Sequence, residues 1–108
     1  MPAGITLQEC PIRTNVSSPV ADVVWISRAR DKKIRAHFAY KSAPEICVEV
    51  RSPSNSQREM NAKRADYFDA GALECWFCNL TGRMTFFGPE GELEQSSLCP
   101  QFPKRVKI

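Results

Sequence analysis

Residues 44–71 read PEICVEVRSPSNSQREMNAKRADYFDAG, and this stretch decides the fold. Its first part alternates as a β-strand does, with successive side chains on opposite faces. One face holds Ile46, Val48 and Val50, and the other holds Glu45, Cys47, Glu49 and Arg51. The pattern predicts a strand over 45–51 with one face in the core and charge on the other, ended by Ser52 and Pro53.

The second part of the stretch has the signals of a helix. Ser56 is followed three residues later by Glu59, which is the spacing of a capping box, and Gly71 is a typical residue just past a helix end. A helix over 57–70 is therefore predicted. Met60, Lys63 and Tyr67 fall on one stripe of this helix, so we expect Lys63 on its buried side.

Working outward, the flanking segments predict further strands. VADVVWIS (20–27) is rich in β-branched residues and is interrupted by Asp22. Residues 73–80 and 83–87 should form a hairpin around a Gly-containing turn, and 5–12 should pair with the strand through Asp22. We expect 28–42 to be a surface connection with a short helical or extended piece near 34–40, and the tail after Leu98 to pack on the sheet edge as extended chain.

Length and composition fit one domain spanning residues 1–108, with 43% hydrophobic residues. We predict a soluble, cytoplasmic protein, because no apolar run is long enough to span a bilayer and the N-terminus lacks a signal-peptide pattern. The net charge of +3 is concentrated in two short basic runs. These runs permit nucleic-acid binding, but a solvated loop and a solvated tail would have the same composition.

The five cysteines do not have the arrangement of a secreted disulfide framework, so reduced thiols are expected. Cys75 and Cys78 lie in an apolar, aromatic segment that predicts a strand. Residues three apart in a strand point to opposite faces and cannot chelate one ion, so no zinc site is expected. His37, in the charged connection, is predicted to be a surface or packing histidine.

Three residues form a combination that suits metal-assisted phosphodiester cleavage: Asp22, Glu49 and Lys63. Carboxylates bind hard cations such as Mg²⁺, and an ammonium group can orient the attacking water or stabilise developing charge. If the helix runs back over the strand, Lys63 and Glu49 each lie roughly 10 Å from the connecting turn and arrive at similar depth. Each residue also has an ordinary structural reading: Asp22 bonded to a turn, Glu49 exposed on a half-solvated sheet, and Lys63 extending from a buried stem.

The order of motifs ADVVWIS, APEICVEVRSPSN, EMNAKRADYFDAG and LECWFCNLTGRMTFF resembles a bacterial family of unknown function, the Uma-type restriction endonucleases. The resemblance runs from about Glu9 to the tail. It implies a PD-(D/E)XK (restriction endonuclease-like) core, that is, an α/β (α+β) fold with a mixed sheet and a packed helix. It also implies that Asp22 and Glu49 bind Mg²⁺ or Mn²⁺ with the carbonyl of Val50, that Lys63 replaces the usual active-site lysine, and that the substrate is DNA.

The chain departs from the superfamily pattern at three places. Ala21 stands where a proline often precedes the first acid. Arg51 occupies the usual position of the lysine, and a guanidinium group cannot give up its proton to act as a base. The N-terminal core helix has no counterpart in this sequence, so we expect an N-terminally shortened core.

Three functional hypotheses follow. The first is a Mg²⁺-dependent endonuclease that hydrolyses DNA, with Asp22, Glu49 and Lys63 as catalytic residues. The second is a non-catalytic relative that acts in nucleic-acid binding or self-association. The third is an inactive remnant whose shortened core is completed by a partner chain, which would make the protein a homodimer. The enzyme should require a divalent ion, whereas DNA affinity of a binding module should survive loss of the two carboxylates.

Overall fold

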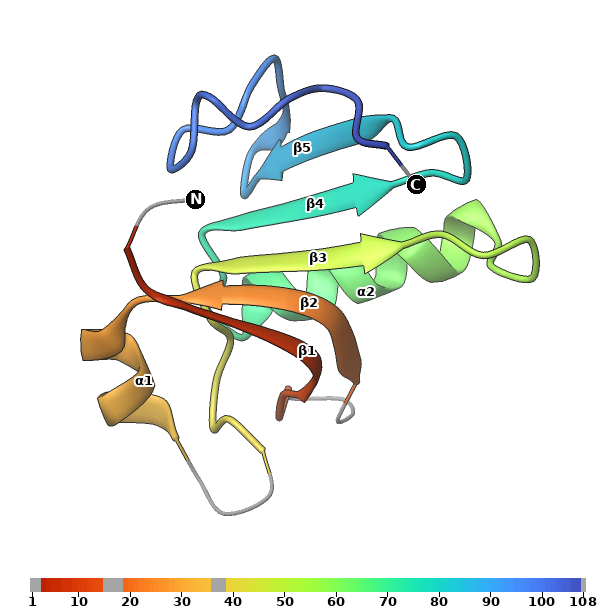
Figure 1. Ribbon diagram of the computed structural model, residues 1–108. Coiled ribbons are helices and arrows are strands. Elements are labelled where there is room, and N and C mark those ends of the chain that lie inside the picture. Colours follow the sequence, from red (N-terminus) through yellow and green to blue (C-terminus); the bar gives the residue numbers. More distant parts are fainter. Residues whose placement is uncertain (1–2, 15–18, 36–38, 108) are drawn as a thin grey trace.

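A computed structural model describes residues 3–14, 19–35 and 39–107, and it contains one mixed, six-stranded sheet (Figure 1). The strands lie side by side in chain order, and β3 and β4 are parallel while every other neighbouring pair is antiparallel. Their bounds are β1 (Ile5–Pro11), β2 (Val20–Ile26), β3 (Ile46–Val50), β4 (Glu74–Cys78), β5 (Met84–Gly88) and β6 (Gly91–Leu93). The α+β fold class and the pairing of β1 with the strand that carries Asp22 are confirmed.

Helix α2 (Gln57–Asp69) connects the two parallel strands and covers one face of the sheet (Figure 1). The predicted capping box is present: the Ser56 side chain accepts from the backbone N–H of Glu59, and the Glu59 side chain accepts from the N–H of Ser56. The chain leaves the helix through Gly71 at φ 105°, a conformation that glycine adopts at little cost. Met60 and Tyr67 are the buried residues of this helix, on the side that the stripe predicts.

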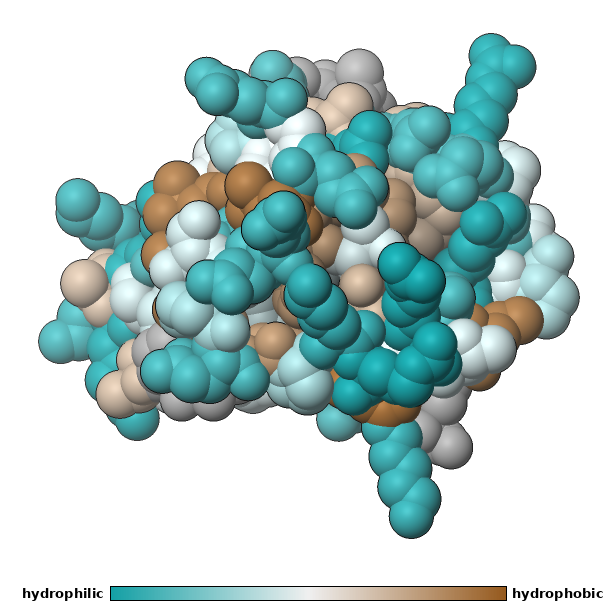
Figure 2. All heavy atoms as spheres, turned by 90° about the horizontal axis from the view of Figure 1, so that it is seen from above, coloured by the Kyte–Doolittle hydropathy of each residue, from teal (hydrophilic) through white to brown (hydrophobic). Residues whose placement is uncertain are grey.

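The C-terminal segment covers the opposite face. Cys99 is buried there against Trp76 and Phe86, and Phe102 packs on the same cluster. The segment also extends the edge of the sheet, because the N–H of Met84 donates to the carbonyl of Lys104. Figure 1 shows this blue segment running past β5, and Figure 2 shows from above a mostly hydrophilic surface with hydrophobic patches between the polar side chains.

One buried carboxylate holds this segment in place. Glu74, 2% exposed, accepts hydrogen bonds from the Ser96 hydroxyl at 2.6 Å and from the backbone N–H groups of Ser97 and Leu98 at 2.9 Å. The indole N–H of Trp76 donates to the same side chain at 2.8 Å. Four donors compensate the carboxylate for its loss of water, and three of them belong to the C-terminal segment.

The two faces of β3 differ from the predicted division into core and charge. Both faces are covered, so Glu45 and Glu49 are themselves buried, at 9% and 1% exposure. The side chains of β3 do alternate between the two faces of the sheet. Alternation alone, however, does not tell whether a polar face meets solvent or another layer of the protein. Val50, at the end of the aliphatic face, is 44% exposed because the strand ends there.

The connection after β2 contains a helix that the sequence analysis placed too late. Helix α1 (Arg28–Ile34) begins directly at the end of β2, whereas the expected piece was at 34–40. Ser27 caps it by accepting from the N–H of Arg30, so the signal was a lone N-cap before only seven residues. Residues 36–38, which include His37, lie outside the described residues.

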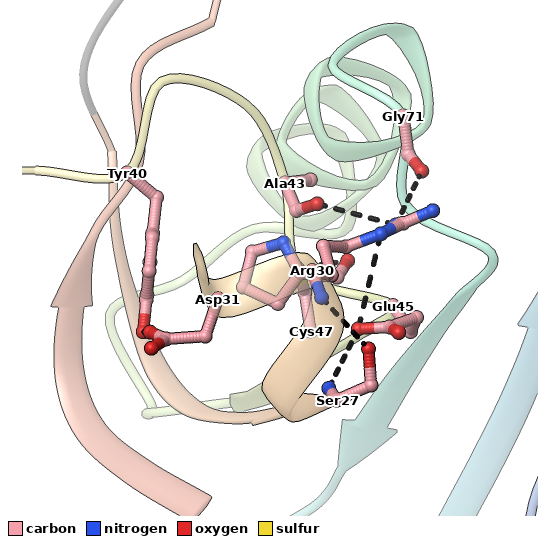
Figure 3. A network of polar contacts seen from close by, with 9 residues as sticks. Ser27, Arg30, Asp31, Tyr40, Ala43, Glu45, Cys47 and Gly71 are labelled. Atoms are coloured by element: carbon pink, nitrogen blue, oxygen red, sulfur yellow. Dashed lines mark hydrogen bonds and ion pairs between the residues drawn. The ribbon is translucent and has the colours of Figure 1, made fainter. Parts of the chain in front are cut away.

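Polar contacts fix α1 against the rest of the fold (Figure 3). The Arg30 guanidinium donates to the carbonyls of Ala43 and Gly71 and lies 3.9 Å from Glu45, whose carboxylate also accepts from the N–H of Ser27. Within the described ranges, neither helix has the length and hydropathy that crossing a bilayer requires. The predicted cytoplasmic location stays a prediction.

Candidate active site

Asp22 and Glu49 face each other at one end of the β2–β3 pair. The antiparallel register aligns Val24 with Cys47 and Val23 with Val48, so the next step places Asp22 opposite Glu49. Opposed residues of an antiparallel pair point to the same face, here the face that α2 covers. The two acidic residues are also bonded across the strands, since Asp22 Oδ2 accepts from the N–H of Val50 at 2.7 Å and Glu49 Oε2 accepts from the N–H of Asp22 at 3.3 Å.

Lys63 reaches this acidic pair from α2. Its Nζ lies 2.9 Å from Glu49 Oε1, and its side chain is 40% exposed while that of Glu49 is 2% exposed. The lysine therefore links a buried carboxylate to the surface of the molecule. The sheet and the helix bring together Asp22, Glu49 and Lys63. The spacing along strand and helix predicted the Glu49–Lys63 contact, whereas Asp22 was expected there from the family resemblance.

Tyr67 is a fourth member of the cluster, although the sequence placed it only on the stripe of the helix and gave it no role in the site. Its hydroxyl donates to Glu49 Oε1 at 2.8 Å, and the residue is fully buried. Tyr67 lies one helical turn after Lys63, on the same stripe, so the two side chains reach one carboxylate oxygen. The signal was available, because a buried tyrosine hydroxyl requires a hydrogen-bonding partner and Glu49 was the nearest expected one.

Burial has the largest effect on Glu49 and raises the pKa of its carboxyl group. The hydrogen bonds from Lys63 and Tyr67 act in the opposite direction, and the proximity of Asp22 raises the pKa further. The net result is a pKa above the ordinary value of glutamate. A second positive charge next to Asp22 and Glu49 would favour their ionised forms, so the cluster has the electrostatic character of a cation site.

The donors available suit a hard, oxygen-preferring cation. Asp22 Oδ2 accepts from the N–H of Val50, and Glu49 Oε2 accepts from the N–H of Asp22, so each of these two oxygens has a second lone pair to offer. The described residues contain no group of three or more acidic, histidine or cysteine side chains arranged around one point. Two carboxylates fit an ion such as Mg²⁺, which keeps several water ligands. The Val50 carbonyl as a further ligand stays a prediction.

Arg51 does not take the place of Lys63. Its Nε donates to the carbonyl of Asn55 and its Nη1 donates to Oε1 of Gln57, both at 3.2 Å. These bonds tie the guanidinium to the turn between β3 and α2. The cation that pairs with Glu49 in this structure is therefore Lys63, on the helix.

The cysteines do not offer a second chemistry. Cys75 packs in the cluster beneath α2 and Cys78 in the cluster on the opposite face, as the strand reading predicted. All five thiols are free and buried. Burial raises the pKa of Cys75 to about 12 and that of Cys10 to about 11, which disfavours the nucleophilic thiolate.

Comparison with known structures supports the same fold. The chain superposes with a TM-score of 0.67 on the crystal structure of a "putative nuclease belonging to DUF820" from Anabaena variabilis, at 18% sequence identity. The alignment covers 81% of this chain and 51% of that one, so this chain matches about half the length of its solved neighbour. No curated protein matches the chain.

A family model described as "Putative restriction endonuclease" matches residues 2–105, which is nearly the whole chain. This match agrees with the motif order and with the mixed sheet on which Asp22 and Glu49 lie. The chain therefore belongs to the Uma2 family of restriction endonuclease-like proteins.

Proposed function

We propose that this protein is a divalent-metal-dependent nuclease that hydrolyses phosphodiester bonds of DNA. The observation that carries the proposal is the clustering of Asp22, Glu49 and Lys63 on one face of the sheet, with the Lys63 ammonium 2.9 Å from the Glu49 carboxylate. Membership of a family described as restriction endonucleases supports the same chemistry. The ion we propose is Mg²⁺, with Mn²⁺ as a substitute.

Each residue has a part that follows from its position. Asp22 and Glu49 would hold the cation, which when bound polarises a phosphate oxygen and makes a bound water more acidic. Lys63 would release Glu49 to the cation and direct its own ammonium toward the attacking water or the charge that develops on the phosphate. Tyr67 would keep Glu49 in place throughout, because its hydroxyl is buried and bonded to that side chain.

Plasmid cleavage tests the proposal directly. Supercoiled DNA is incubated with the protein and Mg²⁺ or Mn²⁺, and nicked and linear products are measured for the wild type, Glu49→Gln and Lys63→Met. We expect each substitution to lower the rate at least about 100-fold, which is typical of losing a group that acts in the transition state. Glu90→Gln, in the exposed β5–β6 turn, is the matched control and should cleave as the wild type does.

Equal cleavage by the wild type and Glu49→Gln would refute the assignment. The non-catalytic alternative is favoured by one observation: the buried Glu49 carboxylate is paired with Lys63 and accepts from Tyr67, as in a structural ion pair. A protein of that class would bind DNA equally well with and without chelator and would cleave none. The predicted homodimer stays a prediction, tested by the mass of the protein in solution.

A further inference from the structure

A cleft of about 300 Å³ lies beside the candidate active site. It opens where the two parallel strands end, and its walls come from both of them. Arg51 follows β3, Asn79 follows β4, and Arg83 directly precedes β5. Ligands of open sheets commonly bind outside the carboxyl ends of parallel strands, which is the position of this cleft.

Two residues that line the cleft are neighbours of the acidic cluster. Phe77 is the register partner of Glu49 across the parallel pair, and both side chains lie on the face that α2 covers. Met60 lies one helical turn before Lys63 and also lines the cleft. The cleft therefore reaches to the strand next to that of Glu49 and to within one helical turn of Lys63.

The polar groups of the cleft are mainly hydrogen-bond donors. The Arg83 guanidinium has no hydrogen bond or ion pair with any described residue, and Arg51 keeps Nη2 without an acceptor in the same part of the chain. Asn79 uses Oδ1 to accept from Thr81 and from the N–H of Arg83, which leaves its amide N–H groups as donors. Among the described residues that line the cleft, Glu92 is the one with a carboxylate.

We propose that this cleft binds a backbone phosphate of the DNA strand, next to the phosphate held at Asp22 and Glu49, with Arg83 as its principal contact. This inference rests on the proposed function, and it assigns to the cleft the binding of one further phosphate of the same DNA substrate. Guanidinium groups match phosphate oxygens in shape and charge.

Helix α1 provides an internal comparison. Residues 28–35 are the most basic segment of the chain, and Lys32 and Lys33 are exposed. This segment follows the other end of β2, roughly 16 Å along the strand from Asp22. If DNA affinity depends only on the net charge of the protein, loss of a positive charge on α1 should weaken binding as much as loss of Arg83 does.

The test measures binding without cleavage. The full chain is kept in EDTA, and fluorescence anisotropy of a labelled 20-base-pair duplex is recorded over a range of salt concentrations. We expect Arg83→Ala to weaken binding roughly tenfold and to reduce the slope of log K against log salt by about one, as loss of one phosphate contact requires. Lys33→Ala should leave both quantities near the wild-type values.

A second variant guards against loss of folding. Glu92→Gln removes the only carboxylate of the cleft lining, so we expect it to bind the duplex about two- to threefold more tightly, a gain that a damaged fold would not give. The proposal is overturned if Arg83→Ala binds like the wild type, if Lys33→Ala loses as much affinity as Arg83→Ala, if Glu92→Gln does not bind more tightly, or if the wild type shows no binding.

The outcome is separable from that of the cleavage test. If DNA binding depends on Arg83 but the wild type cleaves no plasmid with Mg²⁺ or Mn²⁺, the cleft is supported and the nuclease activity is refuted. If plasmid is cleaved and Arg83→Ala binds and cleaves as the wild type does, the nuclease activity stands and the cleft is refuted.

Discussion

Glu49 is a buried acid at the centre of the candidate site. It is almost completely buried, and one of its carboxylate oxygens accepts from both a lysine and a tyrosine. Removing a carboxylate from water has a high cost, and an apolar residue of similar volume would avoid it. Glu74 shows that a buried carboxylate can serve the stability of the fold, so the case for Glu49 as a site residue rests on its place beside Asp22 and Lys63.

The raised pKa of Glu49 makes stability depend on pH in a defined direction. Above the ordinary value of 4.5, the unfolded chain has released a proton that the folded chain still holds. Raising the pH through the window above 4.5 therefore lowers the free energy of unfolding contributed by this group. We expect the wild type to lose stability relative to Glu49→Gln between pH 4 and pH 7, measured by urea denaturation.

Glu90→Gln is the control in these urea denaturation experiments, because it also removes one negative charge but at an exposed position. A difference between the wild type and Glu49→Gln that stays constant with pH, or grows in favour of the wild type, would contradict the expectation. Addition of Mg²⁺ at pH 7 should stabilise the wild type and leave Glu49→Gln unchanged, because a ligand that binds only the folded state raises its stability.

At the scale of elements, α2 both completes the parallel crossover and delivers two side chains to the site. Its position was predictable, because the capping box at Ser56, the buried stripe and the glycine stop at Gly71 all agree. Helix α1 was not, since a single cap before seven residues is a weak signal. The three-residue strand β6 is also too short to recognise from alternation.

Tyr67 links this helix to the sheet through its hydrogen bond to Glu49. Removing only the hydroxyl tests the role of that bond while the aromatic ring stays in the core. Tyr67→Phe removes the hydroxyl that donates to Glu49 and should lower the free energy of unfolding by about 1–3 kcal/mol. It should also raise the Mg²⁺ concentration needed for half-maximal cleavage, because Glu49 loses a fixed orientation. Urea denaturation and metal titration of the cleavage rate measure the two effects.

Tyr40→Phe is the matched control for that experiment. The Tyr40 hydroxyl also donates to a buried carboxylate, Asp31, at 2.6 Å, but it lies beside α1 and away from the acidic cluster. We expect a similar loss of stability with no change in metal dependence. Equal effects of both variants on metal dependence would mean that Tyr67 acts only through general stability.

For the whole molecule, the C-terminal segment matters because it covers the second face of the sheet, opposite α2. Sequence analysis placed the tail on the sheet edge, and the bond from Met84 to Lys104 confirms that edge contact. It did not foresee that the same segment closes the second core, because prolines and scattered apolar residues such as Phe102 carry no periodicity. Tertiary packing, and not local pattern, decides the position of this segment.

Glu74 controls whether this segment stays attached. Glu74→Ala leaves buried donors on Ser96 and Trp76 without an acceptor and should lower the free energy of unfolding by about 2–4 kcal/mol. Trypsin should then cut after Lys104 and Arg105 faster than in the wild type, which mass spectrometry of the fragments would reveal. Glu94→Ala, at an exposed position, should show neither effect, and unchanged cleavage of Glu74→Ala would contradict the anchoring role.

The crossover from β3 through α2 to β4 has a consequence for the order of events during folding. Asp22 meets Glu49 only after β2 pairs with β3, and Lys63 meets them only after the helix has returned over those strands. Contacts between residues far apart in the chain form late, because their loop entropy must be overcome first. A partly folded chain accordingly has no assembled cluster, so Asp22, Glu49 and Lys63 should meet only as the native state is reached.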